Sequence, residues 1–190
     1  MGAFEHVISL LSFVFALAIT HLLLTVAGLI RGWERVRISG PHALWLVIGL
    51  VTVIADWISF WDMRALPAWS VGTIFFVFAL AFVNYLQVAL VCPDIPPEGP
   101  IDLTGFHEAQ SRRYIGGFVA SGVMALLANT IYGAGFNVSE WSVQNLAVIP
   151  MTLAALPAMI WRGRFVQLGS PVLVLAAWIF YFAELQGALH

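Results

Sequence analysis

The stretch from residue 4 to residue 30 reads FEHVISLLSFVFALAITHLLLTVAGLI and contains a single charged side chain, that of Glu5. A helix rises 1.5 Å per residue, so about 20 apolar residues cross the roughly 30 Å hydrocarbon core of a bilayer. The stretch carries the acidic Glu5 near its start, where a secretory signal has basic residues, and it is longer than the apolar region of such a signal. We therefore expect it to remain in the protein as a first membrane helix.

The composition of the whole chain agrees with this assignment. Of its 190 residues, 61% are hydrophobic and 9% are charged, with a formal net charge of −2. Soluble domains carry about 25% charged residues, so the composition excludes an ordinary soluble globule, a disordered chain and a nucleic-acid-binding protein. All basic residues are Arg, which excludes lysine Schiff-base chemistry, and the single Cys92 excludes a disulfide framework.

Five further apolar stretches are long enough to cross a bilayer. We therefore predict an all-α integral membrane protein, a single domain over residues 1–190 that forms a bundle of six transmembrane helices. The amphipathic stretch 103–113 follows a Pro- and Gly-rich turn and predicts an interfacial helix. The six predicted spans are 4–30, 43–63, 67–91, 114–133, 142–161 and 171–187.

The arginines are distributed unevenly among the predicted connections. Alternate connections hold seven of them, and the remaining connections hold only Arg64. The positive-inside rule then places these connections in the cytoplasm and both chain termini on the extracytoplasmic side of the membrane. The arginines of the predicted cytoplasmic connections are Arg31, Arg35, Arg37, Arg112, Arg113, Arg162 and Arg164.

Small residues recur at every fourth position of the predicted fourth span, at Gly117, Ser121 and Ala125. Lipid gives helices no hydrophobic reason to associate, so such stripes mark faces where two helices pack closely. The partner face can belong to the same chain or to another copy. We predict that the protein contacts the lipid bilayer and forms a homo-oligomer or joins a larger membrane complex.

Two acidic residues, Asp56 and Glu184, fall within the predicted hydrocarbon region. Counting along their helices places both in one layer of the outer half of the membrane, together with Asn129. No basic residue is expected at this depth. Each acid is then either neutral and hydrogen-bonded to a neighbour, or part of a hydrated site that binds a proton or another cation.

A second polar layer is predicted closer to the Arg-rich side, at His21, Asn84 and Gln87. A histidine close to its ordinary pKa can relay protons between the acidic layer and the cytoplasm. His21, however, points away from the polar stripe of its own helix at 100° per residue. A neutral histidine bonded to a neighbouring helix is the alternative.

Nothing in the sequence indicates a cofactor or a bound metal. Haem ligation by two histidines needs a pair at equal depth on facing helices, whereas we expect His42 at the membrane interface and His107 in a loop. The motifs HExxH, GxSxG and the Walker glycine loop are absent. No enzymatic activity is therefore indicated by a motif.

Three short motifs near the N-terminus resemble those of a family of uncharacterised small bacterial membrane proteins with six transmembrane helices. They are a Thr-His-Leu-Leu turn at 20–23, an Arg-Val-Arg loop at 35–37 and a His-x-Leu-Trp helix start at 42–45. The resemblance covers about the first third of the chain. It implies the same fold and a location in a bacterial inner membrane, and it implies no activity.

The intramembrane acids lead to the functional prediction of a small channel- or transporter-like protein that uses a carboxylate site for protons or cations. Two alternatives remain. One is a non-catalytic accessory or scaffold subunit that acts through helix–helix contacts, and the other is a protein that handles a lipid or a quinone.

Overall fold

A computed structural model describes residues 2–66, 68–132 and 145–188, with the side chains of Ala3, Asp62 and residues 184–188 outside this description. The described chain is almost entirely helical, which confirms the predicted all-α fold. Two short 3₁₀ segments, Trp33–Arg35 (η1) and Phe60–Ala65 (η2), follow the first two helices. The α-helices are α1 (Ala3–Arg31), α2 (Gly40–Ser59), α3 (Val71–Val91), α4 (Leu103–Tyr132), α6 (Val148–Ile160) and α7 (Arg164–Ala188).

Five of the described helices are long and apolar enough to cross a membrane: α1, α2 with η2, α3, α4 and α7. The helix α6 has 13 residues and is about 20 Å long, so it is shorter than the hydrocarbon core. The predicted fifth span, 142–161, also includes residues 142–144, which lie outside the description. The predicted sixth span began at Pro171, whereas α7 begins at Arg164 and contains that proline in its second turn.

The helix α4 runs without a break from Leu103 to Tyr132. The predicted interfacial helix 103–113 is therefore the first third of α4 and not a separate element. Asp102 precedes α4, and its Oδ1 accepts the backbone N–H groups of Thr104 and Gly105, each at 3.1 Å. These bonds satisfy two of the donors that a helix start leaves open. At 30 residues α4 is about 45 Å long, which exceeds the thickness of the hydrocarbon core.

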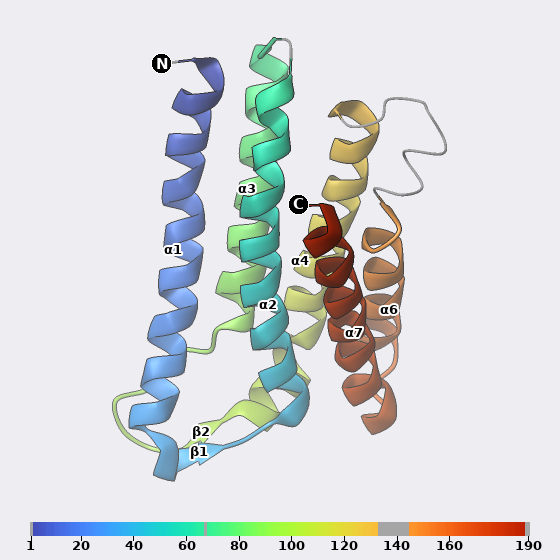
Figure 1. The fold of residues 1–190 in the computed structure, drawn as a ribbon. Helices are drawn as coiled ribbons and strands as arrows, with labels where there is room; N and C mark the ends of the chain where they lie inside the picture. The colour runs from blue at the N-terminus through green and yellow to red at the C-terminus, as the bar shows by residue number, and fades with distance from the viewer. Residues whose placement is uncertain (1, 67, 133–144, 189–190) are drawn as a thin grey trace.

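At one end of the bundle, two connections between helices pair through two short strands, and we call this pairing the clasp (Figure 1). The strand β1 (Val36–Arg37) pairs in parallel with β2 (Ile101–Asp102). Arg35 strengthens the clasp, because its Nη1 donates to the carbonyl oxygen of Gly99 at 2.9 Å. Gly99 has a φ of +87°, which favours glycine at this position. The connection after α1 is thereby fixed to the connection that leads into α4.

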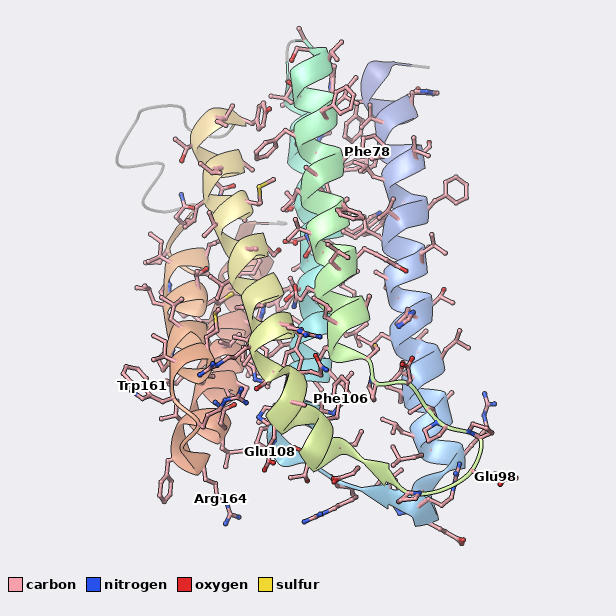
Figure 2. All side chains as sticks on the ribbon, turned by 180° about the vertical axis from the view of Figure 1, so that it is seen from behind. Phe78, Glu98, Phe106, Glu108, Trp161 and Arg164 are labelled. Atoms are coloured by element: carbon pink, nitrogen blue, oxygen red, sulfur yellow. The ribbon has the colours of Figure 1, made fainter. Side chains whose placement is uncertain are left out.

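The charges gather at the same end of the bundle. The connections there, with the last residue of α1, the first turns of α4 and the first residue of α7, carry seven of the eight arginines of the chain. Figure 2 shows Glu98, Glu108 and Arg164 at this end, which we call the Arg-rich end. The N-terminus of α1 lies at the opposite end (Figure 1).

Large apolar side chains cover the outer surface of the helices. Phe13, Phe75 and Ile179 are each about 70% exposed. Contiguous exposed apolar surface of this kind is typical of helices that contact lipid. The described helices are thus compatible with a protein embedded in a bilayer.

The bundle interior forms around α2, which packs against α1, α3, α4 and α7. The small-residue stripe of α4 faces α3 of the same chain. A Cβ atom added to Gly117 would lie 3.1 Å from the Cα atom of Gln87, and Ser121 donates a hydrogen bond to Asn84 at 3.0 Å. The predicted close packing is therefore an intramolecular contact between α3 and α4.

Candidate functional site

A polar cluster lies in the bundle interior where α2, α3 and α4 meet. It consists of Asp56, Asn84 and Ser121, and we call it the carboxyl site. The carboxyl group of Asp56 lies beside the side chains of the other two residues. Asn84 and Ser121 are buried, with 0% and 3% of their surfaces exposed.

The hydrogen bonds of the carboxyl site leave one oxygen without a partner. The Ser121 hydroxyl donates to Oδ1 of Asn84 at 3.0 Å, and Nδ2 of Asn84 donates to the Leu80 carbonyl oxygen at 3.2 Å. The Asp56 Oδ2 atom is buried and has no hydrogen-bond partner among the described residues. A buried polar atom without a partner costs about 1–3 kcal/mol, so the site favours a further ligand for this oxygen.

The sequence of α2 places Asp56 in the interior. His42, Trp45, Gly49 and Thr52 precede it at alternating spacings of three and four residues, which lie on one face of a helix. All four of these residues are buried. Thr52 satisfies its own hydroxyl by donating to the Ile48 carbonyl oxygen at 2.8 Å, so it does not compete for the Asp56 carboxyl.

A carboxyl group in this position can take up a proton or attract a cation. An ionised carboxylate is costly at mid-membrane depth unless a counter-charge or water accompanies it. In the part of the chain that the structure describes, no Arg or His forms an ion pair with Asp56. A proton or another cation that reaches the carboxyl site would therefore neutralise and stabilise the Asp56 carboxylate.

The structure separates Asp56 from Asn129, which the sequence predicted in the same layer. Asn129 lies eight residues after Ser121 on α4, or about 12 Å further along the helix axis. Its Nδ2 donates to Oδ1 of Asn145 at 2.9 Å. Glu184, the second predicted acid, belongs to α7, and its side chain lies outside the description.

Two of the three residues of the predicted inner layer lie in the interior. Asn84 and Gln87 are one turn apart on the buried face of α3. The Oε1 atom of Gln87 is buried without a hydrogen-bond partner among the described residues. His21 is exposed on α1, so the structure does not bring it together with the two amides.

A second polar cluster lies towards the Arg-rich end, and we call it the histidine cluster. Its members are His42, His107, Tyr114 and Gln167, contributed by α2, α4 and α7. The His107 Nε2 atom donates to Oε1 of Gln167 at 2.9 Å, and Nδ1 accepts the Tyr114 hydroxyl. A neutral His107 with its proton on Nε2 satisfies both partners.

His42 lies beside the same tyrosine. The two ring centroids are 6.3 Å apart, and the His42 Nε2 atom donates to the Val91 carbonyl oxygen at 2.8 Å. Its Nδ1 atom is buried without a partner among the described residues. The expectation of His107 in a loop was wrong, because His107 belongs to α4 and is buried, and His42 is buried in the first turn of α2. The start of α4 is polar, so the sequence alone did not indicate that His107 lies on a buried face of a helix.

A pocket of about 320 Å³ opens beside the histidine cluster, lined by His107, Glu108, Arg162 and Gln167. The Arg162 Nη1 atom donates to the Glu108 carbonyl oxygen and to the Ser111 hydroxyl, the latter at 3.2 Å. These bonds join the connection between α6 and α7 to the first turns of α4. Figure 2 shows Glu108 and Trp161 at this end of the molecule.

The buried amide of Gln167 offers a test of this arrangement. Its Nε2 atom donates to the carbonyl oxygens of Ala158 and Trp161 at 2.8 and 2.6 Å, in addition to the bond with His107. We expect Gln167→Leu to lower the free energy of unfolding by about 2 kcal/mol or more, because three polar groups lose their partner and two of the three lost bonds are buried. Unfolding in mixed micelles with increasing SDS measures this change. Gln110→Leu, at a less buried amide, is the control and should stay close to wild type.

The histidine cluster has little capacity to bind a metal or haem. Both ring nitrogens of His107 are engaged, and His42 retains only Nδ1. Within the described residues, no three His, Cys, Asp or Glu side chains converge as metal ligands do. Cys92 is buried after α3, and burial raises the pKa of its thiol, so it is a poor nucleophile.

Sequence reasoning missed the partnership of Asp56 with Ser121 and the whole histidine cluster. A signal for both exists in α4, where His107, Ser111, Tyr114 and Ser121 share one helical face. The polar first turns of α4 resemble a separate interfacial segment, and this resemblance conceals the helical face that continues past residue 113.

Comparison with known proteins adds no assignment. No family model, no curated protein and no solved structure matches this chain.

Proposed function

We infer that the protein is a small channel- or transporter-like membrane protein that moves protons or small cations, with Asp56 as the intramembrane carboxylate. The observation that carries this proposal is the Asp56 Oδ2 atom, buried among α2, α3 and α4 without a hydrogen-bond partner among the described residues. Ionisable groups inside membrane bundles are expensive to keep and most often mark an ion or proton pathway.

The neighbours of Asp56 favour a site that binds and releases a proton or a cation. Asn84 and Ser121 bond to one another and also lie within hydrogen-bonding reach of the carboxyl, but neither side chain carries a charge that would neutralise it. A purely structural acid would be bonded through both oxygens, as buried polar groups in folded proteins generally are. In this proposal a proton or a cation supplies the missing interaction, and its departure leaves the carboxylate ready for the next one.

The orientation is part of the same proposal. Seven arginines at one end of the bundle favour that end as the cytoplasmic one, with the N-terminus of α1 outside. The Asp56 site then lies beyond the histidine cluster when counted from the cytoplasm.

Purified protein in liposomes tests the proposal. We expect the wild type to dissipate an imposed proton, Na⁺ or K⁺ gradient, read with a pH-sensitive or ion-sensitive dye. Asp56→Asn removes the charge and keeps the size of the side chain, so flux should fall to that of empty liposomes. Asp94→Asn, at an exposed acid in the connection after α3, should leave the flux unchanged. Glu184→Gln tests the second predicted acid in the same assay.

The folding of Asp56→Asn must be measured beside its flux. Since Asp56 Oδ2 has no partner to lose, the variant should unfold at the same SDS fraction as the wild type or later. A well-folded variant with undiminished flux removes Asp56 from the mechanism. A folded wild type that carries no flux of any of the three ions leaves the scaffold function in its place.

A further inference from the structure

Buried polar atoms without hydrogen-bond partners are concentrated along one line in the bundle. The described residues contain five such side-chain atoms, and four of them belong to the inward faces of α2 and α3. Buried atoms of this kind are satisfied by internal water or ions in folded proteins. The four atoms are His42 Nδ1, Trp45 Nε1, Gln87 Oε1 and Asp56 Oδ2.

The contacts of α4 put these atoms in order along the bundle. His42 and Trp45 both contact the ring of Tyr114, with centroids 6.3 and 6.2 Å apart. Gln87 lies against Gly117, one turn further along α4, and the carboxyl site follows at Ser121. Along the bundle axis, starting from the Arg-rich end, the histidine cluster therefore comes first, Gln87 second and the Asp56 carboxyl third.

The row of buried polar atoms begins beside the pocket at the Arg-rich end. His107 lines the pocket at the Arg-rich end and also accepts the Tyr114 hydroxyl. From His107 to Ser121 the distance along α4 is fourteen residues, or about 21 Å. A connection between the pocket and Asp56 thus has to extend about 21 Å through the bundle.

We propose that this line, from the pocket at His107 to the Asp56 carboxyl, is a hydrated half-channel that delivers protons from the Arg-rich end. The proposal rests on the proposed function and names the proton as the transported ion and the route as the seam between α2, α3 and α4. Donors and acceptors alternate along it, since Trp45 Nε1 donates while Gln87 Oε1 and the neutral His42 Nδ1 accept. Such atoms hold a chain of water, whereas a dehydrated metal cation requires several oxygen ligands at one place.

Cysteine accessibility to Ag⁺ tests the hydration directly. In a Cys92→Ala background, single cysteines at Thr52, Gln87 and Ser121 place a thiol on the seam, where all three residues are buried. Each has a control on the same helix that faces outward. The controls are Ile54→Cys, Leu86→Cys and Val123→Cys, at residues 39%, 38% and 46% exposed. Glu98→Cys, in the exposed connection at the Arg-rich end, reports which side of the vesicle that end faces.

We expect the seam thiols to react with Ag⁺ at least about tenfold faster than their lipid-facing controls, because the reactive thiolate forms only where water reaches the sulfur. The reaction should occur from the side on which Glu98→Cys reacts, and a fluorescent maleimide added after denaturation reads the thiols that remain. Seam thiols that react no faster than the controls, or only from the opposite side, overturn the half-channel even if Asp56→Asn abolishes flux. Fast reaction in a protein without flux instead overturns the transport function and leaves the hydrated seam.

Discussion

Replacing Gly117 with Leu is expected to lower the free energy of unfolding by about 3 kcal/mol or more. A Cβ atom at this position would lie 3.1 Å from the Cα atom and 3.3 Å from the Cβ atom of Gln87. The obstructing atoms are the Cα and Cβ atoms of Gln87 on α3. Neither atom moves when the side chain changes its rotamer, so rotamer changes cannot relieve the contact. The helices α3 and α4 must separate, and the bond from Ser121 to Asn84 one turn away must lengthen with them.

The neighbouring glycine provides a matched control. A Cβ atom on Gly116 would meet only Cε of Met159, at 3.5 Å, which is ordinary contact with a flexible side chain. Gly116→Leu should therefore unfold near the wild-type SDS fraction, helped by the better helix propensity of Leu. Equal effects of the two substitutions would contradict the close approach of α3 and α4. Loss of oligomers with full monomer stability would assign Gly117 to an interface between chains.

The second large effect is expected at Gly122, where α4 crosses α6. An added Cβ atom would lie 2.2 Å from Oγ1 of Thr152 and 3.3 Å from its Cβ atom. Thr152 is β-branched and its hydroxyl donates to the Val148 carbonyl oxygen at 2.8 Å, so its rotamer has little freedom. We expect Gly122→Ala to lower the free energy of unfolding by about 1–3 kcal/mol.

A compensating substitution separates this contact from a general intolerance at Gly122. Thr152→Ala removes Oγ1 and the methyl group, and leaves one atom at 3.3 Å. The double variant Gly122→Ala, Thr152→Ala should recover most of the stability lost by the first change. A double-mutant cycle in SDS measures this coupling. Additive losses would show that the helices do not approach at this pair.

The sequence determined that this protein consists of helices, most of them long and apolar enough to cross a membrane. Long apolar stretches leave the backbone no partner in lipid except its own helix, so α1, α2, α3, α4 and α7 follow from hydropathy alone. The 3–4 spacing of α2 also places the half-buried Asp56 on the same helical face as the buried His42, Trp45, Gly49 and Thr52.

Only the tertiary structure decided which polar residues meet. Hydropathy carries no information on helix tilt or on which helices are neighbours, so counting along each helix placed Asp56 level with Asn129. The packing of α4 on α3, set by the small Gly117, instead brings Ser121 and Asn84 to Asp56. The same packing gathers His42 and His107 around Tyr114, because partners in a bundle are chosen by the fit between helices and not by their spacing along the chain.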